Sequence, residues 1–178
     1  QTFAVSVLVS NVPIPLRISE FMADNGVTIE DGNGDESDWI EIHNPGLSPG
    51  NLAGWFLTDD TNNLTKWRFP ARNMDPGAYL VVFASGRDQT NATGNLHTSF
   101  QLNSSGEYLA LVDPSGKVAS EFYPTYPAQS DDVSYGRDRL NPNISGYFST
   151  PTPRAANSSS GSGFVPEVQF SHNSRTFP

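Results

Sequence analysis

The sequence predicts an all-β fold in which short antiparallel strands form a β-sandwich. Two observations support this prediction. Short apolar or alternating stretches follow one another along most of the chain, and turns rich in Gly, Pro, Asn and Asp separate them. No stretch has the period of about 3.6 residues that marks an amphipathic helix. Strands joined by short turns are the expected result.

Turn signals bound each predicted strand. An Asn-Pro-Gly sequence at 44–46 and an Asp-Pro-Gly sequence at 75–77 are examples of such signals. In chain order, the predicted strands are Leu16–Phe21, Asp38–Asn44, Gly54–Asp60, Lys66–Pro70, Tyr79–Ser85, Leu96–Leu102, Glu107–Asp113, Lys117–Pro124 and Asp132–Arg137.

Two of these strands have distinct burial patterns. In Asp38–Asn44, Ile40 and Ile42 alternate with aromatic and polar residues, which predicts a strand buried on one face. Tyr79–Ser85 is apolar almost throughout, which predicts a central strand covered on both faces.

Composition divides the chain into four regions. Residues 1–15 form an N-terminal extension, and residues 16–140 form the sandwich. Residues 141–163, rich in Pro, Ser, Asn and Gly, are predicted to be a linker. Residues 164–178 are the start of a following module or an ordered tail. Thr2–Ser10 alternates like a strand and is too short to span a bilayer, so we expect a strand of a preceding domain, a strand paired with a neighbour, or a signal-peptide remnant.

Charge and residue types exclude several functions. The formal net charge is −9 with only 10 Lys and Arg, which argues against nucleic acid as a partner. The chain has no cysteine, so disulfides, thiolate catalysis and Cys-ligated metals are excluded. His43, His97 and His172 are far apart in sequence, and no nucleophile elbow or phosphate loop occurs. We therefore predict that the chain is not an enzyme.

The acidic loop before the second strand is the candidate metal site. Asp31, Asn33 and Asp35 are at alternate positions and Asp38 follows, which resembles the spacing of oxygen ligands in calcium loops. The EF-hand pattern is incomplete, because the sixth and twelfth positions lack the required Gly and Glu. The alternative is a solvated surface loop stabilised by Asx turns. Calcium is the only cofactor that the sequence suggests.

Three tryptophans are candidates for a carbohydrate platform. Trp39, Trp55 and Trp67 each lie in a predicted strand. Exposed coplanar rings would bind sugars, whereas packing in the core is the ordinary role of aromatic residues in strands.

A series of motifs resembles the lamin-tail domain, the immunoglobulin-like module of nuclear lamins that also occurs in large bacterial surface and secreted proteins. The resemblance runs from Leu16 to about Asn157 and is closest to the bacterial form. It rests on the ordered motifs RISEFMADN, SDWIEIHNPG, LAGWFLTDD, KWRFP, DPGAYLVVFASG, LHTSFQL, SGEYLALVDPSG, DVSYGR and YFSTPTPRAAN. It implies an immunoglobulin-like sandwich without catalytic activity, which in lamins binds proteins and chromatin.

The resulting functional prediction is a noncatalytic interaction, adhesion or spacer module of a bacterial secreted, periplasmic or cell-surface multi-domain protein. Its partners would be other proteins or neighbouring domains of the same polypeptide. One alternative is a structural subunit of an extracellular or periplasmic assembly, in which the terminal strands pair with neighbouring molecules. Another is a carbohydrate-binding accessory of a hydrolase.

Overall fold

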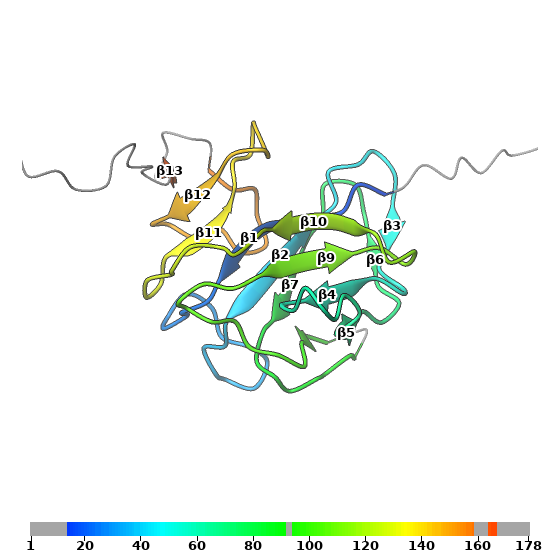
Figure 1. Ribbon diagram of the computed structural model, residues 1–178, viewed down its shortest axis with the longest axis horizontal. Coiled ribbons are helices and arrows are strands. Elements are labelled where there is room, and N and C mark those ends of the chain that lie inside the picture. Colours follow the sequence, from blue (N-terminus) through cyan, green and yellow to red (C-terminus); the bar gives the residue numbers. More distant parts are fainter. Residues whose placement is uncertain (1–13, 92–93, 159–163, 167–178) are drawn as a thin grey trace, which may run out of the picture.

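The structure of the protein is a computed structural model that describes residues 14–91, 94–158 and 164–166. These residues form strands and loops (Figure 1). The strands are β1 (Arg17–Met22), β2 (Trp39–His43), β3 (Gly50–Asn51), β4 (Phe56–Thr58), β5 (Trp67–Arg68), β6 (Asn73–Met74), β7 (Tyr79–Phe83), β8 (Leu96–His97), β9 (Leu109–Val112), β10 (Val118–Phe122), β11 (Ser134–Arg137), β12 (Ser145–Phe148) and β13 (Phe164–Pro166).

Two sheets pack against each other, as the sequence predicts. The larger sheet has the strand order β13-β12-β11-β1-β2-β7-β8, and the smaller one has the order β10-β9-β4-β5. Neighbouring strands are antiparallel except β7 and β8, which run parallel. Strands β3 and β6 form a separate small ladder. Figure 1 shows β9, β10 and β4 lying across β1, β2 and β7. The all-β sandwich prediction is confirmed.

The main core lies between the two sheets. Ile40 and Ile42 of β2 and Val82 of β7 face it from the larger sheet, and Leu109 and Leu111 of β9 face it from the smaller one. All five side chains are completely buried. The alternation along these strands follows from the pleat, which sends successive side chains to opposite faces.

Strand β2 differs from the prediction of burial on one face only. Trp39, on the face opposite Ile40, is also completely buried, and it packs in a second cluster with Met22, Val81 and Phe83. The half-buried assignment is therefore wrong. Ile29 of the loop between β1 and β2 packs against this cluster, and residues 151–157 cover Glu41 on the same face, which period-two alternation alone does not reveal.

Strand β7 confirms the prediction of a strand covered on both faces. Val82 belongs to the main core, and Val81 and Phe83 belong to the outer cluster. The next predicted strand, Leu96–Leu102, is paired mainly at β8, and its remainder is irregular with one isolated bridge at Gln101.

The range 141–163, predicted as a linker, contains strand β12, which pairs with β11. Its Phe148 is 1% exposed. Residues 151–157, the C-terminal strap, then lie against the outer face of the larger sheet, and the backbone of β13 adds to the β12 edge. The predicted strand Thr2–Ser10 and residues 167–178 lie outside the described residues.

Candidate functional site

Asp31, the first of the four predicted calcium ligands, is buried and turned toward its own loop. Its Oδ1 accepts hydrogen bonds from the backbone N–H groups of Asn33 (2.8 Å) and Asp35 (3.3 Å). Its Oδ2 accepts from the Ser37 hydroxyl (2.8 Å) and from Arg87 Nη1 (2.5 Å). Burial raises the pKa of Asp31, but the hydrogen bonds and the Arg87 charge outweigh it, so the pKa is lower than usual.

The other predicted ligands do not all converge on Asp31. The Asp35 carboxylate binds the same Arg87 guanidinium, and the side chain of Asn33 is exposed. Asp38 accepts a hydrogen bond from the backbone N–H of Asn25, and burial raises the pKa of Asp38 to about 6.

The described residues contain no cluster of three or more His, Asp or Glu side chains arranged to hold a metal ion. The Arg87 guanidinium forms ion pairs with both loop carboxylates, Asp31 and Asp35. Calcium binding stays a prediction. Ligation by both Asp31 and Asp35 would require Arg87 to move away.

The three tryptophans are all part of the packed interior. Trp39, Trp55 and Trp67 are at most 5% exposed, and Trp67 packs edge-on against Phe69 at 4.8 Å between ring centroids. The packing interpretation is confirmed for these residues. They cannot offer flat rings to a sugar.

The two described histidines have separate structural roles. His43 stacks on Tyr79 with parallel rings 4.2 Å apart, and His97 shares a hydrogen bond of 2.8 Å between its Nδ1 and the Ser85 hydroxyl. His172 lies outside the described residues. The Asp31 Oδ2 atom lies 3.9 Å from the same His97 Nδ1 that contacts Ser85. In a catalytic triad the serine and the carboxylate contact opposite ring nitrogens, so Ser85, His97 and Asp31 do not have that arrangement.

Sequence reasoning missed a pair of buried glutamates on the outer face of the larger sheet. Glu20 of β1 and Glu41 of β2 are register partners, and both are completely buried. Glu20 accepts hydrogen bonds from the N–H (3.0 Å) and hydroxyl (2.7 Å) of Thr152. Glu41 accepts from the Ser19 hydroxyl (2.6 Å) and the Arg154 N–H (2.5 Å). The pair therefore anchors the C-terminal strap.

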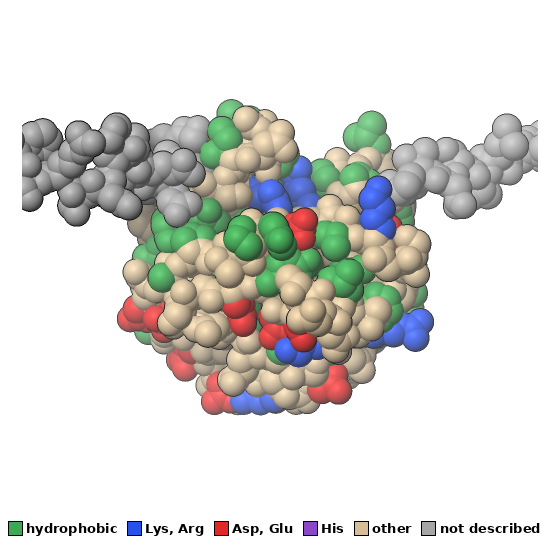
Figure 2. Space-filling view, in the orientation of Figure 1, with side chains coloured by type: hydrophobic (Ala, Val, Ile, Leu, Met, Phe, Trp, Pro, Cys, Tyr) green, Lys and Arg blue, Asp and Glu red, His purple; other side chains and the backbone are tan. Residues whose placement is uncertain are grey.

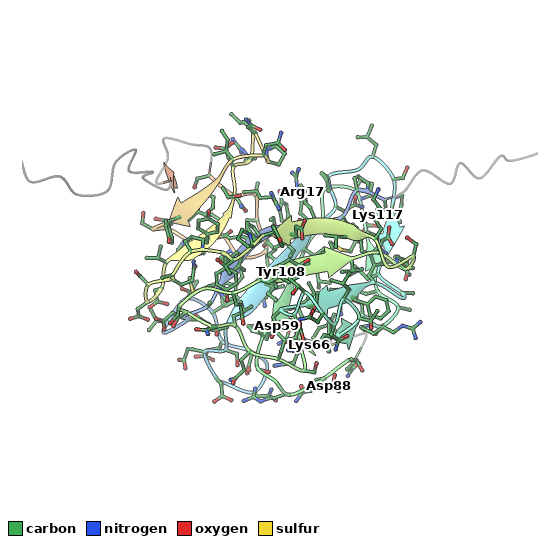
Figure 3. All side chains as sticks on the ribbon, viewed as in Figure 1. Arg17, Asp59, Lys66, Asp88, Tyr108 and Lys117 are labelled. Carbon is green, nitrogen blue, oxygen red and sulfur yellow. The ribbon has the colours of Figure 1, made fainter. Side chains whose placement is uncertain are left out.

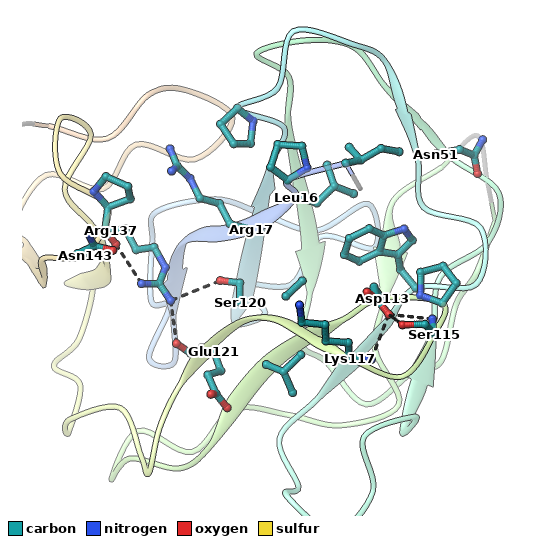
Figure 4. Close-up of a pocket in the computed structure, with 18 residues that line it drawn as sticks. Leu16, Arg17, Asn51, Asp113, Ser115, Lys117, Ser120, Glu121, Arg137 and Asn143 are labelled. Carbon is teal, nitrogen blue, oxygen red and sulfur yellow. Dashed lines mark hydrogen bonds between the residues drawn. The ribbon is translucent and has the colours of Figure 1, made fainter. Parts of the chain in front are cut away.

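An open groove between β1, β10 and the β11–β12 hairpin also escaped the sequence analysis (Figure 4). Its volume is about 1230 Å³. Pro15, Pro114 and Pro142 contribute apolar surface, and Arg17 and Arg137 contribute positive charge. In Figure 2, basic side chains gather beside hydrophobic ones at the upper centre of the molecule, and Figure 3 places Arg17 and Lys117 along this side. The residues that line this groove come from distant parts of the sequence, from Ile14 to Asn143, so no single sequence motif identifies the groove.

Arg137 is held firmly in the groove by neutral acceptors. Its guanidinium donates to the backbone oxygens of Ile18 (3.2 Å), Pro142 (3.1 Å) and Glu121 (2.7 Å). It also lies 4.7 Å from the Phe122 ring centroid. Burial lowers the pKa of Arg137, and the nearby Arg17 charge adds to this effect. Such a low-mobility cation is suited to binding an anion.

Arg17 is less restrained. Its guanidinium makes a weak polar contact of 3.4 Å between Nη2 and His43 Nδ1. Among the described residues, no carboxylate forms an ion pair with Arg17 or Arg137. The Glu121 carboxylate, which also lines the groove, accepts a hydrogen bond from the Tyr108 hydroxyl (2.9 Å) instead.

The two packed antiparallel sheets define an immunoglobulin-like β-sandwich module. The Lamin Tail Domain family matches residues 11–125, more than half of the chain, and the protein belongs to this family of noncatalytic domains. No curated protein matches the chain. The family match ends before β11 and β12, which complete the same sheet. None of the described segments is a helix with the length and apolar character needed to cross a membrane.

Proposed function

We propose that the chain is a noncatalytic protein-interaction module of a bacterial secreted or cell-surface multi-domain protein. The groove beside β10 carries this proposal. It combines apolar surface with two arginines that have no carboxylate partner among the described residues. Binding sites in general combine apolar contact area with a few placed polar groups.

The path of the chain supports a second role as a spacer within the same polypeptide. The described chain begins on the right of Figure 1, and β13 lies on the left. A module with its two ends on opposite sides fits in line between neighbouring domains. The groove lies between these two ends, so connections to neighbouring domains at the ends would leave it open to a partner. The spacer and interaction roles are therefore compatible.

Site-specific photo-crosslinking in the full-length protein tests the interaction role. The crosslinker p-benzoylphenylalanine replaces Asn143, which lines the groove, and in a control variant it replaces the exposed Asn62 after β4. We expect a discrete protein or domain adduct from position 143 and none from position 62. Equal labelling at both positions, or no adduct at position 143, would refute the proposal.

Two other functions stay predictions. A structural subunit would use terminal strands for pairing, and the backbone of β13 occupies the edge of its own sheet. Sedimentation that shows a monomer at all concentrations would contradict that role. A carbohydrate-binding surface would have to use residues other than the buried tryptophans. Tyr123 is 70% exposed, but it packs edge-on to Tyr108 and does not form a coplanar pair.

A further inference from the structure

We propose that the groove binds an extended acidic peptide segment, whose carboxylates contact Arg17 and Arg137. This assignment rests on the interaction function proposed above and names the chemistry of the partner. Figure 4 shows both arginine side chains at one end of the groove, with Lys117 further along it.

Charge complementarity is the first argument. The protein carries a formal net charge of −9, yet basic side chains gather in this groove. The groove lining has three basic residues, Arg17, Lys117 and Arg137, and two acidic ones, Asp113 and Glu121. Asp113 lies at the end of the groove away from the arginines, where it accepts from the Ser115 hydroxyl (2.6 Å) and the backbone N–H of Lys117 (3.1 Å), and Glu121 accepts from the Tyr108 hydroxyl (Figure 4). Arg17 can pair with a carboxylate through two parallel N–H donors. Arg137 can donate its second Nη1 N–H, because its other N–H groups contact Ile18, Pro142, Ser120 and Glu121. An acidic ligand is therefore favoured.

The fixed position of Arg137 is the second argument. Three backbone oxygens and an aromatic ring hold its guanidinium before any ligand arrives. A preorganised cation loses little side-chain entropy on binding. Arg17, with one weak contact, can adjust to the second carboxylate.

The shape and lining of the groove favour a peptide over other anions. One wall is β10, the outer strand of the smaller sheet, which pairs only with β9 among the described strands. Such an edge offers backbone groups to an extended segment, here mainly near Ala119, because the Arg137 guanidinium already occupies the Glu121 carbonyl oxygen (2.7 Å). Pro15, Pro114 and Pro142, which are exposed or partly exposed in the groove lining, supply apolar contact for side chains of the peptide.

The test uses a fluorescein-labelled peptide of alternating valine and glutamate, a valine–glutamine control peptide, and the full chain. Fluorescence anisotropy should show saturable binding of the glutamate peptide that weakens with salt. The R17Q variant should bind the glutamate peptide at least about tenfold more weakly than the wild type, because a charge-assisted contact is lost. The matched variant R154Q removes the same charge from the strap on the outer face and should bind like the wild type.

Two further measurements distinguish loss of peptide binding from loss of the folded structure in the R17Q variant. Fluorescence of the buried tryptophans reports whether R17Q is native. Amide chemical shifts should change on peptide addition at Lys117–Ala119 and not at β5.

Three results would overturn the peptide assignment: equal loss of binding in R17Q and R154Q, equal binding of the glutamine peptide, or tighter binding of heparin or a phosphoserine peptide. No binding of the glutamate peptide, combined with a specific adduct at position 143, would overturn the acidic chemistry and leave the interaction function intact. Loss of the adduct would instead refute the proposed function itself.

Discussion

Glu20 and Glu41 face each other on neighbouring strands, and both carboxyl groups are completely buried beneath the C-terminal strap. No Lys, Arg or His of the described residues forms an ion pair with either. Burial raises the pKa of Glu41 to about 8, and the nearby Glu20 adds to this effect. Burial also raises the pKa of Glu20. Two adjacent buried carboxyls favour the state in which at least one proton is retained.

The first prediction concerns pH. The folded chain keeps a proton on Glu41 up to about pH 8, whereas an unfolded chain releases it near the ordinary value of 4.5. The resulting stability is fully present below about pH 4.5 and is lost as the pH rises through about 8. The E41Q variant imitates the neutral group, so it should gain stability relative to the wild type with rising pH. We expect about 2 kcal/mol or more at pH 9, measured by urea unfolding.

The exposed Glu36 provides the control. E36Q removes the same charge without changing a buried carboxyl, and its stability relative to the wild type should stay nearly constant across this pH range. Parallel pH profiles for E41Q and the wild type would contradict a neutral buried Glu41.

The second prediction concerns the end of the folded unit. A fragment of residues 14–140 lacks β12 and the strap, which leaves Glu20 and Glu41 without their covering segment. We expect it to be at least about 4 kcal/mol less stable than residues 14–158, or not to fold, because buried polar groups and the core around Phe148 become exposed. Chemical denaturation followed by tryptophan fluorescence measures the difference. Equal stability would place the domain end at 140.

The third prediction concerns the acidic loop. In D31N, the side-chain amide N–H₂ group replaces the Oδ2 atom that accepts hydrogen bonds from Ser37 and Arg87. The amide hydrogens then face the donor groups of Ser37 and Arg87, and neither hydrogen bond can form. We expect a loss of about 2–3 kcal/mol at neutral pH. The lowered pKa of Asp31 gives stability that is present above the ordinary value of 3.8 and lost as the pH falls through the folded value. The unfolding curves of D31N and the wild type should therefore converge in acid. A constant difference would show that the Asp31 charge is not involved.

The fourth prediction tests calcium in the same loop. Because Arg87 binds both Asp31 and Asp35, it competes with any ion that uses these ligands. If the site binds calcium, R87A should bind it more tightly than the wild type. The measurement is the change in melting temperature between added calcium and chelator in both proteins. The absence of any shift in R87A would end the calcium hypothesis.

Local patterns in the sequence predicted much of the fold. The alternation of Ile40 and Ile42 located one core strand, and the apolar run around Val82 located its buried neighbour. The tryptophans were assigned to packing for the same reason. The loop around Asp31 contains an Asx turn, the feature of its alternative interpretation, because the residue that closes such a turn lies two positions away in the chain.

The sequence by itself determined the all-β class, the order of most strands and the family, because period-two patterns and turn residues are local properties. Only the tertiary structure decided three features: the burial of Glu41 under the strap, the pairing of Asp31 with Arg87, and the joining of Arg17 and Arg137 in one groove. Each of these depends on residues brought together by sheet packing across long sequence separations, which no local pattern encodes.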